Sequence, residues 1–79
     1  MASHAVRAFE AGRWTAKSDR NGGMSNGNVL RCYGIIRARR QEDGTVIVYT
    51  GNGFSAAQRR MVADLLTVFP NATLTPYVR

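Results

Sequence analysis

The feature that most constrains the fold is a pair of β-rich segments joined by an Asp-Gly turn. Residues 29–40 separate cleanly when they are read with a period of two, because apolar side chains alternate with arginine and tyrosine. Residues 45–50 are rich in β-branched side chains, and Asp43-Gly44 between the two segments is a strong hairpin signal. The sequence therefore predicts an antiparallel hairpin, with 29–40 as one strand and 45–50 as the other.

The alternation also assigns the two faces of the first strand. The face expected to pack in the core carries Leu30, Cys32, Ile36 and Ala38. The opposite face, with Gly34 and Ile35 at the crossover, carries the expected partner-binding residues Arg31, Tyr33, Arg37 and Arg39, with Arg40 close to the strand end. Tyrosine and arginine are enriched in interface hot spots. The alternative is that arginines on an open sheet face only keep the face soluble and protect it against edge pairing.

A helix is predicted to follow the hairpin. Ser55 and Gln58 have the spacing of a capping box, which starts a helix over about 56–69. Its apolar stripe is expected to pack on the sheet beside Leu30, Ile36 and Val48, and consists of Met61, Val62, Leu65, Leu66 and Phe69. Arg59 and Arg60 lie mostly away from this stripe and form a second candidate patch.

The two ends of the chain are less constrained. Residues 6–9 and 13–18 predict a hairpin around Ala11-Gly12, whereas a helix over 4–11 is the alternative. Trp14 and Tyr49 are each expected to pack against neighbouring strands of the sheet. Residues 19–28 are rich in glycine and asparagine and predict a loop without a P-loop signature. Residues 73–78 predict a last strand, which Pro76 confines to an edge.

Together these segments predict one α+β domain over residues 1–79. It consists of a small antiparallel sheet of about four to five strands with one helix, over about 56–69, packed on one face. A short N-terminal helix is the open alternative to a further strand. With 79 residues the domain builds only a thin core, so dimerisation would help its stability, and either a monomer or a homodimer is expected.

The net charge of +6 favours an anionic partner. It comes from ten arginines and Lys17 against five carboxylates. Arginine binds phosphate and carboxylate bidentately and also stacks on aromatic rings, so nucleic acid is one candidate partner. The alternative explanation is that a GC-rich genome prefers arginine codons, so that the arginines reflect codon usage and not a binding partner.

Residues typical of catalysis are sparse. His4 is the only histidine and Cys32 the only cysteine, so neither an intrachain disulfide nor a metal site of the paired-cysteine kind is expected. The serines lie in no nucleophile motif, and the N-terminal residues lack the long apolar stretch of a signal peptide or membrane span. We therefore expect a cytoplasmic binding protein without enzymatic activity, cofactor or membrane contact.

Several short segments resemble small orphan proteins carried by phages and prophages. They are Trp14-Thr-Ala-Lys-Ser, Gly23-Met-Ser-Asn, Leu30-Arg-Cys-Tyr-Gly, Asp43-Gly-Thr-Val-Ile-Val-Tyr and Phe54-Ser before the helix that contains Arg59. The chain is similar to the short anti-CRISPR proteins directed at type I systems, with type I-C as one candidate. The resemblance covers roughly residues 14–66.

This resemblance implies a protein that binds a type I CRISPR effector complex, or its helicase-nuclease, and blocks recognition or cleavage of target DNA. It transfers no binding residue to this chain. A common anti-CRISPR pattern is an acidic protein that mimics DNA in the basic channel of the effector. The charge of +6 departs from this pattern, so DNA mimicry is not expected. The alternative function is that of a small phage-encoded basic nucleic-acid-binding protein.

Overall fold

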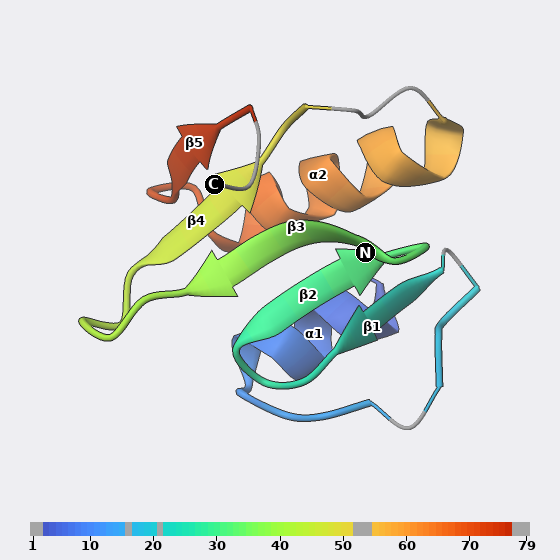
Figure 1. Ribbon diagram of the computed structural model, residues 1–79, viewed down its shortest axis with the longest axis horizontal. Coiled ribbons are helices and arrows are strands. Elements are labelled where there is room, and N and C mark those ends of the chain that lie inside the picture. Colours follow the sequence, from blue (N-terminus) through green and yellow to red (C-terminus); the bar gives the residue numbers. More distant parts are fainter. Residues whose placement is uncertain (1–2, 16, 21, 52–54, 77–79) are drawn as a thin grey trace.

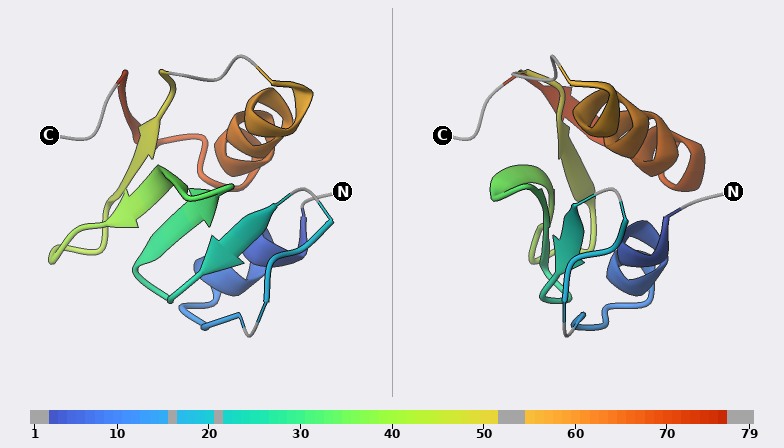
Figure 2. Two further views of the ribbon diagram at one scale, coloured as in Figure 1. Left: turned by 45° about the vertical axis from the view of Figure 1, so that its right-hand side comes forward. Right: turned by 90° about the vertical axis from the view of Figure 1, so that its right-hand side faces the viewer.

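A computed structural model describes residues 3–15, 17–20, 22–51 and 55–76 as a five-stranded sheet with two helices on one face (Figure 1; Figure 2, right). The elements in chain order are α1 (His4–Glu10), β1 (Gly23–Ser25), β2 (Val29–Cys32), β3 (Ile35–Arg40), β4 (Val46–Tyr49), α2 (Ala56–Val68) and β5 (Thr73–Thr75). Neighbouring strands are antiparallel, except that β4 pairs with β5 in parallel. The predicted α+β class is thus confirmed.

The N-terminal segment is helical, so the predicted hairpin is wrong there and the helix alternative is right. The Ser3 hydroxyl accepts a hydrogen bond from the Val6 N–H at 3.2 Å, which satisfies one free donor of the first turn. Ala5, Val6 and Phe9 have helical spacing and are fully buried. Their shared apolar face stabilises the helix against the sheet.

The glycine-rich segment predicted as a loop contains the short strand β1. A Cβ atom at Gly23 would lie 2.6 Å from Met61 Cε and 2.8 Å from the Ala5 Cβ. A residue with a side chain at position 23 would clash there, so glycine allows β1 to lie close to both α1 and α2.

The predicted long strand over 29–40 is instead two strands, β2 and β3. Tyr33 and Gly34 form a two-residue turn between them, with φ angles of 50° and 81°. Positive φ at both positions is the conformation of a type I′ hairpin turn. Residues 29–40 are therefore themselves a hairpin.

A β-bulge in β3 changes which side chains face the core. The pairing steps from Leu30↔Ala38 to Arg31↔Ile36, which leaves Arg37 as the extra residue. Arg37 and Ala38 are both fully buried, whereas Ile36 is half-buried. The predicted inward position of Ile36 and outward position of Arg37 are therefore wrong.

The predicted β3–β4 hairpin and the second helix are confirmed. Ala38 pairs with Val48 and Arg40 with Val46. The helix α2 begins after Ser55, whose hydroxyl accepts from the Gln58 N–H at 3.1 Å. It crosses from β4 to the parallel strand β5, as β-α-β units do.

The core lies between the sheet and the two helices. Met61 and Leu65 of α2 are fully buried together with Leu30 and Val48, as predicted, while Val62, Leu66 and Phe69 are partly buried around them. The Phe69 ring meets Phe9 edge to face, with centroids 5.6 Å apart. Among the described residues, no helix has the length and apolar character needed to cross a membrane.

Candidate binding surfaces

The face of the sheet opposite α1 and α2 carries two rows of side chains, one residue from each of three neighbouring strands. One row is Met24↔Arg31↔Ile36, and the other is Val29↔Arg39↔Ile47. We call these six residues the outer face. Each row has an arginine in the middle with an aliphatic residue on either side.

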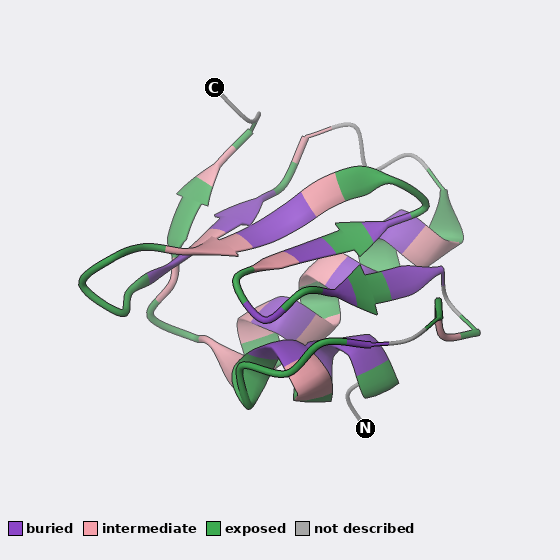
Figure 3. Ribbon diagram, turned by 60° about the horizontal axis from the view of Figure 1, so that its bottom comes forward, coloured by how far each residue is buried: buried purple, intermediate pink, exposed green. Residues whose placement is uncertain are grey.

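The outer face is open to solvent on the described part of the chain. Arg31 is exposed and Met24 is 42% exposed, while the other four residues are half-buried. Exposed and buried residues alternate along β1 and β2 (Figure 3). Arg31 and Arg39 make no hydrogen bond or ion pair with the described residues. Their charges therefore remain available to an anionic partner.

Tyr33 lies at the tip of the β2–β3 turn, and its side chain is 65% exposed. The Tyr33 N–H donates to the Gly22 carbonyl at 2.9 Å, and a Cβ atom at Gly22 would lie 2.5 Å from Tyr33 Cζ. The ring therefore lies against the Gly22 backbone. Tyr33 remains accessible to a partner, as predicted, but in a turn and not in a strand.

Arg37 is not on the outer face, although it was predicted there. Its side chain is fully buried, and its Nε donates to Gln58 Oε1 at 2.7 Å. Its Nη1 donates to the carbonyls of Tyr49, at 2.9 Å, and of Gly51. Gln58 Nε2 donates in turn to the Cys32 carbonyl at 2.8 Å. Arg37 thus links three strands and α2 from inside the protein.

Burial shifts the pKa values of two groups in this region. Desolvation lowers the pKa of the Arg37 guanidinium, and it raises the pKa of the Cys32 thiol, an effect that the Arg37 charge partly offsets. Cys32 is fully buried. A buried thiol with a raised pKa is a structural group and a poor nucleophile.

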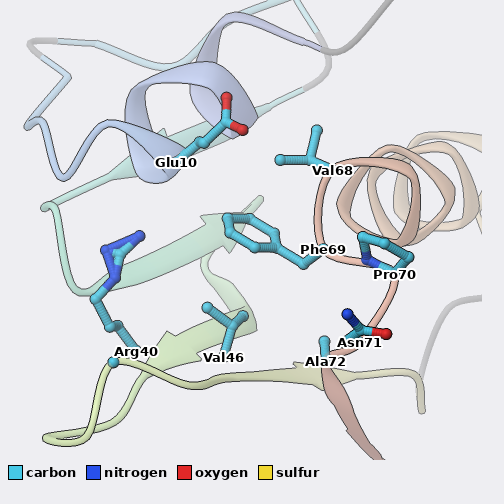
Figure 4. A pocket seen from close by; sticks show the side chains of 9 residues that line it. Glu10, Arg40, Val46, Val68, Phe69, Pro70, Asn71 and Ala72 are labelled. Carbon is cyan, nitrogen blue, oxygen red and sulfur yellow. The ribbon is translucent and has the colours of Figure 1, made fainter.

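Arg40 also lies away from the outer face, at the C-terminal end of α1. Its Nη2 donates to the Phe9 carbonyl at 2.7 Å, and its guanidinium carbon lies 4.9 Å from the centroid of the Phe9 ring. A cation at this position complements the negative end of the helix. Arg40 also lines a hollow of about 420 Å³ between α1, the β3–β4 turn and the end of α2 (Figure 4).

The second candidate patch is exposed as predicted. Arg59 and Arg60 are both exposed on α2, which covers the opposite face of the sheet. They are therefore separated from the outer face by the thickness of the domain.

Two carboxylates without an assigned role support the N-terminal end of α1. Asp19 Oδ2 accepts from the Ala5 N–H at 3.1 Å, and Asp64 Oδ2 accepts from the Ser3 N–H at 3.2 Å. Acidic groups are favourable at this end of a helix. Within the described ranges, no group of three or more His, Cys, Asp or Glu residues could hold a metal ion.

Sequence reasoning missed the aliphatic part of the outer face and the exposure of Trp14. A strict period of two places Ile36 on the same face as Ala38, and the bulge at Arg37 reverses that placement. Comparison with protein-family models, with curated proteins and with solved structures gave no match. The fold and the surfaces therefore define only a class, a small α+β domain with one open sheet face.

Proposed function

We propose that this chain is a non-enzymatic binding protein whose outer face docks onto a protein partner in the cytoplasm of a bacterial host. The observation that carries the proposal is the pair of cross-strand rows, each with one arginine between two aliphatic residues. Protein interfaces combine apolar contact with a few arginines that make directional hydrogen bonds. A surface that served only solubility would not need four aliphatic side chains beside its charges.

The composition of this face favours a protein over a nucleic acid. A phosphate backbone is bound mainly by many cationic side chains, and affinity scales with the number of phosphates contacted. The outer face offers two arginines among four aliphatic residues and no aromatic ring on which a base could stack. Acidic groups flanked by apolar residues on a protein match this pattern better.

The partner we propose is a subunit of a type I CRISPR effector complex or its helicase-nuclease. This step rests on the resemblance to short anti-CRISPR proteins. Binding there would block recognition or cleavage of target DNA without any reaction catalysed by this chain.

The test reverses the two charges of the outer face. Arg31→Glu with Arg39→Glu should abolish capture of the effector subunits in a pull-down, and phage should lose protection in a CRISPR-positive host. A like-charge contact at an interface costs several kcal/mol, which is more than a hundredfold in affinity. Circular dichroism should show an unchanged fold.

The matched control is Arg59→Glu with Arg60→Glu, which changes the net charge equally on the opposite side of the domain. It should retain capture and protection. Full activity of the folded Arg31/Arg39 variant, or equal loss in the control, would show that the outer face is not the docking site.

A further inference from the structure

A second surface, separate from the outer face, lies where α1 meets the segment that follows it. It is a groove of about 400 Å³, within the range of small-molecule sites, which is about 300–1,000 Å³. We call it the Trp14 groove, and its lining residues are His4, Arg7, Ala8, Ala11, Arg13 and Trp14.

Trp14 is 71% exposed, so its predicted role in cross-strand packing is wrong. Tyr49, for which the same role was predicted, is buried. The tryptophan side chain is the largest in the chain and gains most from burial. Its exposure leaves a wide aromatic surface in contact with water, where a flat ligand can cover it.

The backbone that carries Trp14 is firmly held on both sides. The Arg13 N–H donates to the Ala8 carbonyl at 2.7 Å, and the Thr15 N–H donates to the Ser25 carbonyl at 2.8 Å. Trp14 itself forms a β-bridge with Asn26. The exposed ring therefore projects from an ordered segment, and a ligand need not order the chain before it binds.

The charges of the groove are all of one sign. Arg7 and Arg13 are exposed, His4 adds a further nitrogen base, and none of the described residues that line the groove is acidic. A ligand that fits both features has a flat aromatic group for the tryptophan and an anion for the arginines.

We propose that the Trp14 groove binds single-stranded nucleic acid, with one base stacked on Trp14 and the adjacent phosphates bound by Arg7 and Arg13. Proteins that bind single strands combine such a stacking aromatic with cationic side chains along the backbone. A duplex is disfavoured because its bases are already stacked on one another. An acidic peptide satisfies the arginines but offers no flat group for the ring. This site does not depend on the docking role of the outer face.

The test uses the intrinsic fluorescence of Trp14, which is the only tryptophan in the chain. Titration of the wild-type protein with oligo(dT) should quench this fluorescence saturably. A duplex of equal length should quench it at least tenfold less effectively. Absence of quenching by oligo(dT), or equal quenching by the duplex, would overturn the proposal.

The stacking contact is tested by removing the ring. Trp14→Leu should weaken binding of a fluorescein-labelled oligo(dT), measured by anisotropy, by roughly 5- to 150-fold, the range for loss of one base–aromatic stack. Trp14→Phe keeps an aromatic face and should recover most of the affinity. If a folded Trp14→Leu variant bound as tightly as wild type, the base would not stack there.

The phosphate contacts are tested by salt dependence. Arg7→Gln with Arg13→Gln should reduce the slope of log affinity against log salt by about 1.4, because each single-strand phosphate contact contributes about 0.7. The control Arg59→Gln with Arg60→Gln removes the same charge from α2 and should leave the slope unchanged. Equal reduction in both variants would indicate attraction by net charge alone.

Two further comparisons separate this site from other possibilities. Oligoglutamate should neither quench Trp14 nor displace oligo(dT), and displacement would point to an acidic protein segment as the ligand. Arg31→Glu with Arg39→Glu should still show saturable Trp14 quenching, so failure of the outer face and failure of the groove are distinguishable.

Discussion

At the scale of single residues, the role of an arginine here depends on where the backbone turns its side chain. Arg37 and Arg39 are two residues apart, yet Arg37 is fully buried and Arg39 is half-buried on the outer face. The bulge at Arg37 causes this difference, because it adds one residue to β3 between two paired positions. A buried guanidinium is retained only where hydrogen bonds satisfy its donors, and Gln58 and two carbonyls accept from it.

Replacing Arg37 should therefore destabilise the fold and not merely reduce binding. Arg37→Met fills similar space but leaves the Gln58 side chain and the carbonyls of Tyr49 and Gly51 without their donor. We expect the free energy of unfolding to fall by at least about 1 to 3 kcal/mol, the cost of leaving a buried acceptor without its donor. Arg37→Lys should also lower the free energy of unfolding, because an ammonium lacks the planar fork of donors. Urea denaturation followed by circular dichroism measures the change.

Arg39→Met is the matched control for this prediction. Its guanidinium makes no hydrogen bond to the described residues, so the free energy of unfolding should change by no more than about 0.5 kcal/mol. Equal stability of the Arg37 and Arg39 variants would contradict the role assigned to the buried network.

At the scale of elements, tight turns set which strands pair. Tyr33-Gly34 reverses the chain between β2 and β3, and Gly44 has a φ of 87° in the turn before β4. Gly34 has no atom within 4 Å of the position a Cβ would take, so only its backbone conformation requires glycine.

Gly34→Ala should thus be destabilising through backbone strain alone. We expect about 1 to 2 kcal/mol, the cost of a left-handed conformation for an ordinary residue. Gly34→Asn should cost less, because asparagine adopts this conformation more readily. Thermal melting measures both. If Gly34→Ala melted at or above the temperature of Gly34→Asn, the turn conformation described here would be wrong.

The same turn explains how far the sequence could predict these elements. Asp43-Gly44 is a common hairpin dipeptide and Ser55 a common N-cap, so the β3–β4 hairpin and α2 were predicted correctly. Tyr33 at positive φ is rare, and only the interrupted alternation at Gly34 indicated a break. The bulge at Arg37 has no sequence signal of its own, because pairing with β2 creates it. Of the five predicted binding residues, Arg31, Tyr33 and Arg39 are accessible. The bulge turns Arg37 inward, and Arg40, next to Arg39 in the strand, points to the other side of the sheet and contacts Phe9.

At the scale of the whole molecule, one cluster of buried residues joins both helices to the sheet. Ten residues from α1, α2 and the central strands β2 to β4 form it. A domain of this size has little stability to lose, because the free energy of unfolding of folded domains is typically only about 5 to 15 kcal/mol. Truncation of one core side chain should therefore destabilise the whole domain and not only its own element.

Leu65→Ala tests this cooperativity, because Leu65 is fully buried in α2 at the centre of the cluster. Truncating a buried leucine costs about 2 to 5 kcal/mol, so the melting temperature should fall sharply. Cys32, which is fully buried in β2, should become reactive toward a thiol reagent at a correspondingly higher rate, since it reacts only when the domain opens. Leu74→Ala is the matched control, because Leu74 is 55% exposed on the edge strand β5, and it should change neither quantity appreciably. If Leu65→Ala lowered the melting temperature without faster Cys32 labelling, α2 would unfold separately from the sheet, and the single core described here would be two.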